Sequence, residues 1–118
     1  MIVFLTTDLM MASNARSHAR QHSVTVKTAE SESNTVEVIQ ADRPHLLLVD
    51  LQTPGLNIES LGEQIRKMSD SMTPLTVAFA QHVNVDLLEK AKTAGFDQVL
   101  TRGQFNNQIG RIISDTAL

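Results

Sequence analysis

The chain has 118 residues, a formal net charge of −3 at pH 7 and no cysteine. This length predicts a single domain, residues 1–118, that can bury a hydrophobic core without disulfides or metals. The absence of cysteine excludes thiol nucleophiles and fits a reducing compartment, so we expect a cytoplasmic protein. The negative charge argues against a nucleic-acid binder, and no apolar run is long enough to span a membrane.

The first elements are a strand and a helix. Residues Ile2 to Leu5 form an apolar run typical of a buried strand. Apolar residues at helical spacing predict a helix from Leu9 to about Gln21. This helix carries the only basic cluster of the chain, which we interpret as a solvated helix face. The cluster consists of Arg16, His18, Arg20 and His22.

A second strand and a short helix are predicted next. Valine alternates with polar residues over residues 24–27, which indicates a less buried strand. Asn34, with Glu37 three residues later, is typical of a helix start that is capped from both sides. Pro44 ends this helix.

The stretch from Arg43 to Asn57 predicts the centre of the fold. Four consecutive apolar residues, 46–49, lead into Asp50, and a turn at Pro54 and Gly55 follows. A continuous apolar run between a proline and a turn is typical of a parallel strand buried on both faces. Asp50 is then expected at the carboxyl end of that strand, where ligands bind in open α/β sheets.

The rest of the chain repeats the alternation of helix and strand. Asn57 is predicted to cap a third helix, and residues 75–80 form another apolar strand. Asn84 and Gly95 are expected to bound a fourth helix. Residues 98–101 are a short fifth strand, followed by a last helix. The buried residues of that helix are Phe105, Ile109, Ile112 and Ile113.

This alternation predicts a three-layer (βα)5 fold. We expect a doubly wound, parallel five-stranded sheet in the order 2-1-3-4-5, with helices on both faces. The strand order then reverses between the first and third strands, and the residues at the ends of the strands share one crevice. These residues are Thr6, Thr7, Asp8, Asp50, Ala80 and Arg102.

Two segments resemble a known family. PHLLLVDLQTPGLN is similar to the third strand and following loop of receiver domains of two-component response regulators, with Asp50 and the Pro54-Gly55 turn at the family's spacing. AKTAGFDQVLTRG resembles the family's fourth helix through fifth strand, with Gly95 at its glycine. The resemblance covers essentially the whole chain. It implies a CheY-like, flavodoxin-like fold and a role in bacterial two-component signalling, with no enzymatic activity beyond self-phosphorylation.

The resemblance also implies a site, which this chain matches only in part. Asp50 stands at the phosphoacceptor position. In the family, Mg²⁺ is held by this residue, by a carbonyl two residues later, here Gln52, and by an acidic pair after the first strand. Thr6 and Thr7 occupy the positions of that pair. Asp8 comes one residue late, so Mg²⁺ binding by Asp8, Asp50 and Gln52 is predicted to be weak, and no other cofactor is expected.

Four further family positions also differ. The hydroxyl residue that ends the fourth strand corresponds to Ala80 when counted back from Gly95, or to Phe79 when counted from Pro74. Val99 replaces the family's aromatic switch residue. A lysine and a cis proline are replaced by Arg102 and Gly103, and an arginine is no steric copy of a lysine.

Each candidate residue also has a structural interpretation. Asp50 is either a residual functional residue or one half of a structural ion pair with Arg102. Thr6 and Thr7 form a polar strand end in front of the first helix. Asp8 is favoured as the cap of that helix over a metal ligand.

These observations leave three functions open. The favoured one is a degenerate receiver, or pseudo-receiver: a phosphorylation-independent interaction module that binds a protein such as a histidine kinase or an output protein. The family's usual dimer face, formed by its fourth helix, fifth strand and fifth helix, corresponds to residues 84–113. The alternative is a phospho-accepting receiver in which Asp50 is phosphorylated with Mg²⁺ held by Asp8 and Asp50. A flavin binder is the third, but the chain lacks the Trp and Tyr residues on which flavins usually stack.

Overall fold

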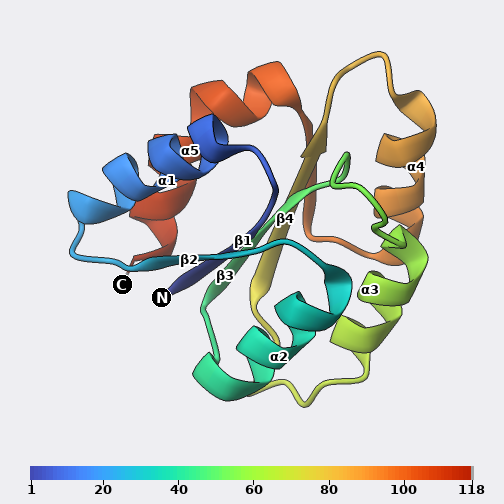
Figure 1. The fold of residues 1–118 in the computed structure, drawn as a ribbon, viewed down its shortest axis with the longest axis horizontal. Coiled ribbons are helices and arrows are strands. Elements are labelled where there is room, and N and C mark those ends of the chain that lie inside the picture. The colour runs from blue at the N-terminus through green and yellow to red at the C-terminus, as the bar shows by residue number, and fades with distance from the viewer. Residues whose placement is uncertain (118) are drawn as a thin grey trace.

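The computed structural model describes residues 1–117 and contains one parallel sheet in the strand order β2-β1-β3-β4-β5 (Figure 1). Five strands alternate with five helices among these residues, which confirms the predicted fold. The elements are β1 (Ile2–Leu5), α1 (Leu9–Arg20), β2 (Val26–Ala29), α2 (Glu32–Asp42), β3 (Leu46–Asp50), α3 (Ile58–Arg66), β4 (Leu75–Ala80), α4 (Val85–Ala94), β5 (Gln98–Thr101) and α5 (Arg102–Thr116).

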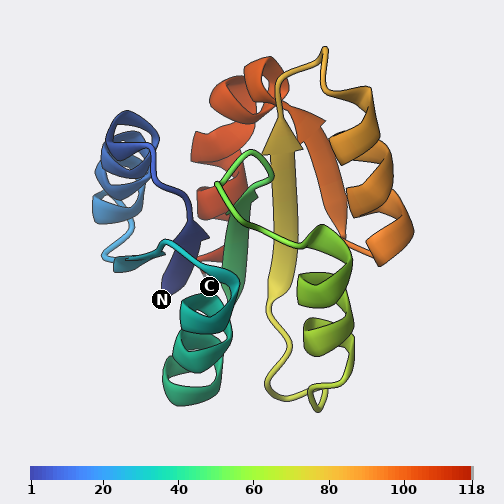
Figure 2. The same cartoon turned by 45° about the vertical axis from the view of Figure 1, so that its right-hand side comes forward.

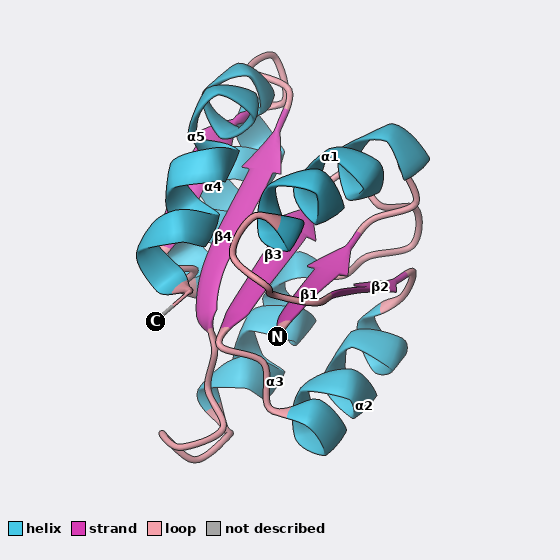
Figure 3. Cartoon of the chain, turned by 90° about the vertical axis from the view of Figure 1, so that its left-hand side faces the viewer, coloured by secondary structure: helices cyan, strands magenta, loops and turns pink. Residues whose placement is uncertain are grey.

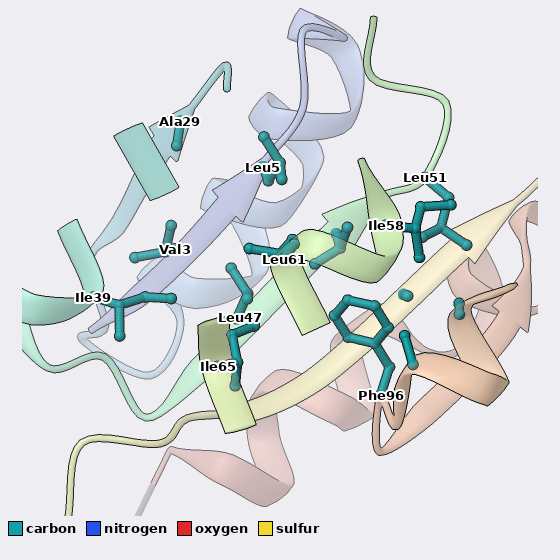
Figure 4. Close-up of a cluster of buried hydrophobic side chains, with 14 of the residues drawn as sticks. Val3, Leu5, Ala29, Ile39, Leu47, Leu51, Ile58, Leu61, Ile65 and Phe96 are labelled. Atoms are coloured by element: carbon teal, nitrogen blue, oxygen red, sulfur yellow. The ribbon is translucent and has the colours of Figure 1, made fainter. Parts of the chain in front are cut away.

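Helices cover both faces of the sheet, so the core has two halves. One half lies between the sheet and α2, α3 and α4, and Figure 4 shows side chains such as Leu47, Leu61 and Phe96 meeting there. The other half lies between the sheet and α1 and α5. Within residues 1–117, none of the helices has the length and apolar character needed to cross a membrane.

The central strands follow the predicted pattern. All five side chains of β3 are buried, including that of Asp50, because helices pack on both faces of this strand. β3 pairs with β1 on one side and β4 on the other. The apolar run before Asp50 therefore places this residue at the carboxyl end of the central strand of the sheet.

Some predicted boundaries differ from the structure. The prediction that α2 begins at Asn34 was wrong, because Ser31 is the N-cap and its Oγ accepts a hydrogen bond from the Asn34 N–H at 3.1 Å. Asn34 is the third residue of the helix. Asn84 does precede α4 as predicted, but its side chain makes no capping hydrogen bond.

Gly62 marks a close contact between α3 and α4. A Cβ on Gly62 would lie 2.8 Å from the Ala94 Cβ and 2.9 Å from the Ala94 carbonyl oxygen. We therefore expect Gly62→Ala to lower the free energy of unfolding by about 1–2 kcal/mol, because overpacking outweighs the gain in helix propensity. Urea unfolding measures this. Gly103→Ala is the control, since a Cβ there meets nothing within 4 Å, and equal effects of both changes would contradict the expectation.

Candidate functional site

The candidate site lies at the carboxyl edge of the sheet, where the loops after β1, β3 and β4 approach the start of α5 (Figure 2). The parallel register brings these strand ends level. Leu5 pairs with Val49, so the next residues, Thr6 and Asp50, are neighbours. Asp50 is in turn paired with Phe79 in β4.

Asp50 is buried and hydrogen-bonded through both carboxylate oxygens. Its Oδ2 accepts a hydrogen bond from Thr6 Oγ1 at 2.9 Å, and its Oδ1 accepts one from the Gln52 N–H at 3.0 Å. The residue is 7% exposed. Thr53 Oγ1 donates to the Asp50 carbonyl at 2.7 Å and fixes the start of the following turn. Internal donors therefore hold both oxygens at the position that the resemblance assigns to the phosphoacceptor.

Thr6 also connects Asp50 to the start of α1. Its Oγ1 accepts a hydrogen bond from the Asp8 N–H at 3.0 Å, while it donates to Asp50. The hydroxyl is thus used as donor and acceptor at once, and the residue is buried. Thr7, the other predicted acidic-pair position, is exposed.

Asp8 caps α1 and binds Arg102. Its Oδ1 accepts hydrogen bonds from Met10 N–H at 3.0 Å and Met11 N–H at 3.1 Å. Its Oδ2 lies 2.7 Å from Arg102 Nη2. Of the two interpretations of Asp50, the ion pair with Arg102 was therefore wrong, because α5 begins directly at Arg102 and packs beside α1, which brings Arg102 to the α1 cap.

The pKa of Asp8 is lowered, first by the hydrogen bond from the Met11 N–H; desolvation opposes this, and the hydrogen bond and charge of Arg102 and the hydrogen bond from the Met10 N–H lower it further. A carboxyl group whose pKa is lower in the folded than in the unfolded protein stabilises the fold at pH values above its pKa in the unfolded state. This contribution is lost as the pH falls through its pKa in the folded state. We therefore expect Asp8→Asn, which keeps a capping side chain, to cost about 1 kcal/mol at pH 7, a value discounted for the partial exposure of both partners.

The difference in free energy of unfolding between the natural chain and Asp8→Asn should stay constant from neutral pH down to about pH 5 and shrink below about pH 4. Denaturant unfolding over this pH range measures it. Arg102→Gln should lower the free energy of unfolding by less than Asp8→Asn does, and this loss should shrink over the same pH range. A difference that grows with acid would contradict this assignment.

Two glutamines join the loops after β3 and β4, a contact that the sequence analysis missed. The Gln52 side-chain oxygen accepts a hydrogen bond from the Gln81 N–H at 2.8 Å. No pattern in the sequence predicts this contact, because it depends on the Gln52 side chain reaching from the end of β3 to the end of β4. Gln52 was predicted only through its carbonyl.

The remaining candidate positions support the architecture of the site. Ala80 is buried, and Val99 packs against the core half below α3 and α4. Gly55 adopts a left-handed conformation with φ 78°, which the turn after β3 requires. Gly103 lies in the first turn of α5, and all peptide bonds of the described residues are trans.

The donors at this edge do not fit Mg²⁺. Residues 1–117 contain no group of three or more His, Cys, Asp or Glu side chains that could hold a metal ion. Hard divalent cations need charged oxygen ligands, but Thr6 offers a neutral hydroxyl beside Asp50. The second carboxylate, Asp8, is bound by Arg102 and by the backbone of α1. We therefore assign no step to a metal here.

A groove of about 620 Å³ opens beside the site, between the loop after β4 and the start of α5. It is lined by Gln81, His82, Val83, Thr101, Arg102, Gly103 and Asn106.

No protein-family model and no curated protein matches the chain, but solved structures do. The chain is similar to a response regulator receiver domain from Bermanella marisrubri, with a TM-score of 0.81, 19% identity, and coverage of 99% of this chain and 97% of the other. It is also similar to the receiver domain of a sensor histidine kinase from Pseudomonas aeruginosa that has magnesium in its cleft (TM-score 0.80, 16% identity, 98% and 95% coverage).

A third similar structure is the chemotaxis response regulator CheY4 of Vibrio cholerae, with a TM-score of 0.75, 15% identity, and coverage of 99% of this chain and 97% of the other. At such low identity the likeness establishes the fold. This protein has the receiver-domain fold of two-component response regulators.

Proposed function

We propose that this protein is an atypical receiver domain, a pseudo-receiver, that signals through protein contacts without phosphorylation of Asp50. The observation that carries this proposal is the hydrogen bond of 2.9 Å from Thr6 Oγ1 to Asp50 Oδ2. A neutral hydroxyl lies where the family places a metal-binding acid. The carboxylate is thereby bound to the protein itself.

The charges around Asp50 also support this proposal. Phosphoryl transfer depends on cations that neutralise the transferred group and orient it towards the attacking oxygen. Arg102 is the cationic residue at the family's lysine position, and its guanidinium forms an ion pair with Asp8. The chain thus has few charged ligands for a metal beside Asp50, and the charge of Arg102 is neutralised by Asp8.

The exposed side chains favour an interaction role. Leu9 and Met10 are each 82% exposed at the start of α1, and Val83 and Val85 are 68% and 58% exposed around the start of α4. Both pairs lie beside the carboxyl edge of the sheet. Exposed apolar side chains that gather on one side of a domain are typical of contact surfaces. The partner would be a histidine kinase or an output protein, with residues 84–113 as a candidate dimer face.

Phosphorylation in solution tests this proposal. We expect no mass increase of one phosphoryl group when the protein is incubated with Mg²⁺ and acetyl phosphate and its intact mass is measured. A receiver domain known to be phosphorylated by acetyl phosphate serves as the positive control. A stoichiometric adduct that disappears in Asp50→Asn would overturn the proposal and support the alternative, a phospho-accepting receiver that uses Asp8 and Asp50.

A further inference from the structure

The outer edge of β2 is open. β2 is the first strand in the sheet order and pairs only with β1, so one side of its backbone faces away from the sheet (Figure 3). The strand lies at the margin between α1 and α2, which pack on opposite faces of the sheet. An open strand edge is a template for pairing with another extended chain.

The hydrogen bonds to β1 show which backbone groups of β2 are free. The carbonyls of Thr25 and Ala29 accept hydrogen bonds from Ile2 N–H at 2.8 Å and Thr6 N–H at 3.0 Å. Because backbone direction alternates along a strand, Val26 and Thr28 point their N–H and C=O groups outwards. Among the described residues, no hydrogen bond from another element is made to these groups.

Two arginines lie beside this edge. Arg16 and Arg20 of α1 line a groove of about 230 Å³ together with residues 24–26, the last of which begins β2. Both side chains are exposed, and within residues 1–117 neither forms an ion pair or a side-chain hydrogen bond. No acidic residue lines the groove. His18 of the same helix lies instead against Gly110 of α5, so the basic cluster is divided between two sides of α1.

The spacing of the arginines fits an extended partner. Residues four apart on a helix lie roughly 6 Å apart along its axis. Alternate residues of a strand, which point to the same face, lie roughly 6.6 Å apart. Since α1 runs back along the sheet between β1 and β2, acidic side chains two residues apart on an added strand would reach Arg16 and Arg20. The Val26 side chain belongs to the core half between the sheet and α1 and α5. The two arginines of α1 therefore lie on the same face of the sheet as Val26.

We propose that the β2 edge binds an extended acidic segment of a partner protein, with two carboxylates separated by one residue. The backbone of this segment would pair with Val26 and Thr28 and extend the sheet, and its carboxylates would bind Arg16 and Arg20. Main-chain pairing supplies affinity in such complexes, and side chains at alternate positions supply specificity. The proposal assigns one contact surface to the proposed interaction role. The β2 edge does not involve Asp50, so this proposal and the proposed absence of Asp50 phosphorylation can be disproved separately.

Titration with a capped peptide, acetyl-Ser-Thr-Glu-Val-Glu-Val-Ser-amide, tests the proposal by amide NMR of the full chain. We expect the Val26 and Thr28 amides to shift and to become protected from hydrogen exchange. Replacing both Glu by Lys in the peptide should abolish these effects. Arg16→Gln and Arg20→Gln should each weaken binding roughly twofold to fivefold, the range for exposed ion pairs, and salt should weaken it further.

Thr28→Pro removes one outward N–H without removing a hydrogen bond to β1, and proline is tolerated on edge strands. We expect this variant to fold but to lose peptide binding, whereas Thr28→Val, which keeps the N–H, should bind. The proposal is overturned if the peptide at about 1 mM leaves both amides unchanged, or if it shifts β5 instead. It is also overturned if the Lys peptide binds equally well, or if a single-stranded oligonucleotide alone perturbs Arg16 and Arg20.

Discussion

Thr6→Asp is expected to destabilise the protein in metal-free buffer and to make its stability dependent on Mg²⁺. The Thr6 hydroxyl lies 2.9 Å from Asp50 Oδ2, so the new carboxylate would face a buried carboxylate instead of donating to it. Two like charges roughly 4 Å apart repel by about 4 kcal/mol at an effective dielectric constant near 20. After side-chain relaxation we expect a loss on the order of 2 kcal/mol, which lowers the melting temperature by roughly 10 °C.

Addition of Mg²⁺ should reverse this loss, because two adjacent carboxylates are the ligands that the natural chain lacks. At a concentration one hundred times the Kd, a bound ion adds about 2.7 kcal/mol. Thermal melts with and without Mg²⁺ measure both effects. Thr6→Asn is the matched control, because asparagine has nearly the same shape as aspartate but no charge. The melting temperature of this variant should not respond to Mg²⁺. An equal response of the natural chain and Thr6→Asp would show that Thr6 does not limit metal binding.

The fold could be predicted from the sequence because its signals are local and repeated. The apolar run of residues 46–49 cannot be solvated on either face, so it requires a central strand with helices on both sides. Gly95 was correctly placed after α4, where it adopts φ 90°, a conformation that few other residues accept. Five strand–helix units in series leave few ways to connect a parallel sheet.

The contacts of the site were harder to predict, since each joins segments far apart in the sequence. The alternative that paired Arg102 with Asp50 was wrong because the charge of a strand end says nothing about the direction of its side chain. Only the absence of a loop between β5 and α5 brings Arg102 to Asp8. The start of α2 was misplaced because Ser31 and Asn34 are both good capping residues, and local sequence does not choose between them.

Three contacts connect the loops after β1, β3 and β4 with one another and with the start of α5. Thr6 joins the first loop to Asp50, Asp8 joins it to α5, and Gln52 joins the loops after β3 and β4. Each contact uses a polar side chain that would otherwise be available to a ligand. The protein's own groups therefore occupy these polar side chains, which agrees with a proposed role that needs no phosphoryl switch.

Phe79 connects this edge to a cluster of three aromatic rings, which also contains Phe4 and Phe105. Its ring stacks on that of Phe105 with centroids 4.1 Å apart and meets the Phe4 ring edge-on at 6.0 Å. The Phe79 carbonyl also accepts a hydrogen bond from the Leu51 N–H at 2.9 Å, just after Asp50. The ring therefore fills the core half below α1 and α5 directly behind the site.

Phe79→Ala is expected to lower the free energy of unfolding by about 3–5 kcal/mol, the range for deleting a buried ring and leaving a cavity. Phe79→Leu should cost much less, since it keeps most of the volume. Denaturant unfolding of Phe79→Ala, Phe105→Ala and the variant with both changes separates the energy of ring stacking from the energy of burying each ring. We expect a coupling between the two rings of about 0.5–1.5 kcal/mol. Strictly additive losses would show that the two rings stabilise the core independently, although they are stacked.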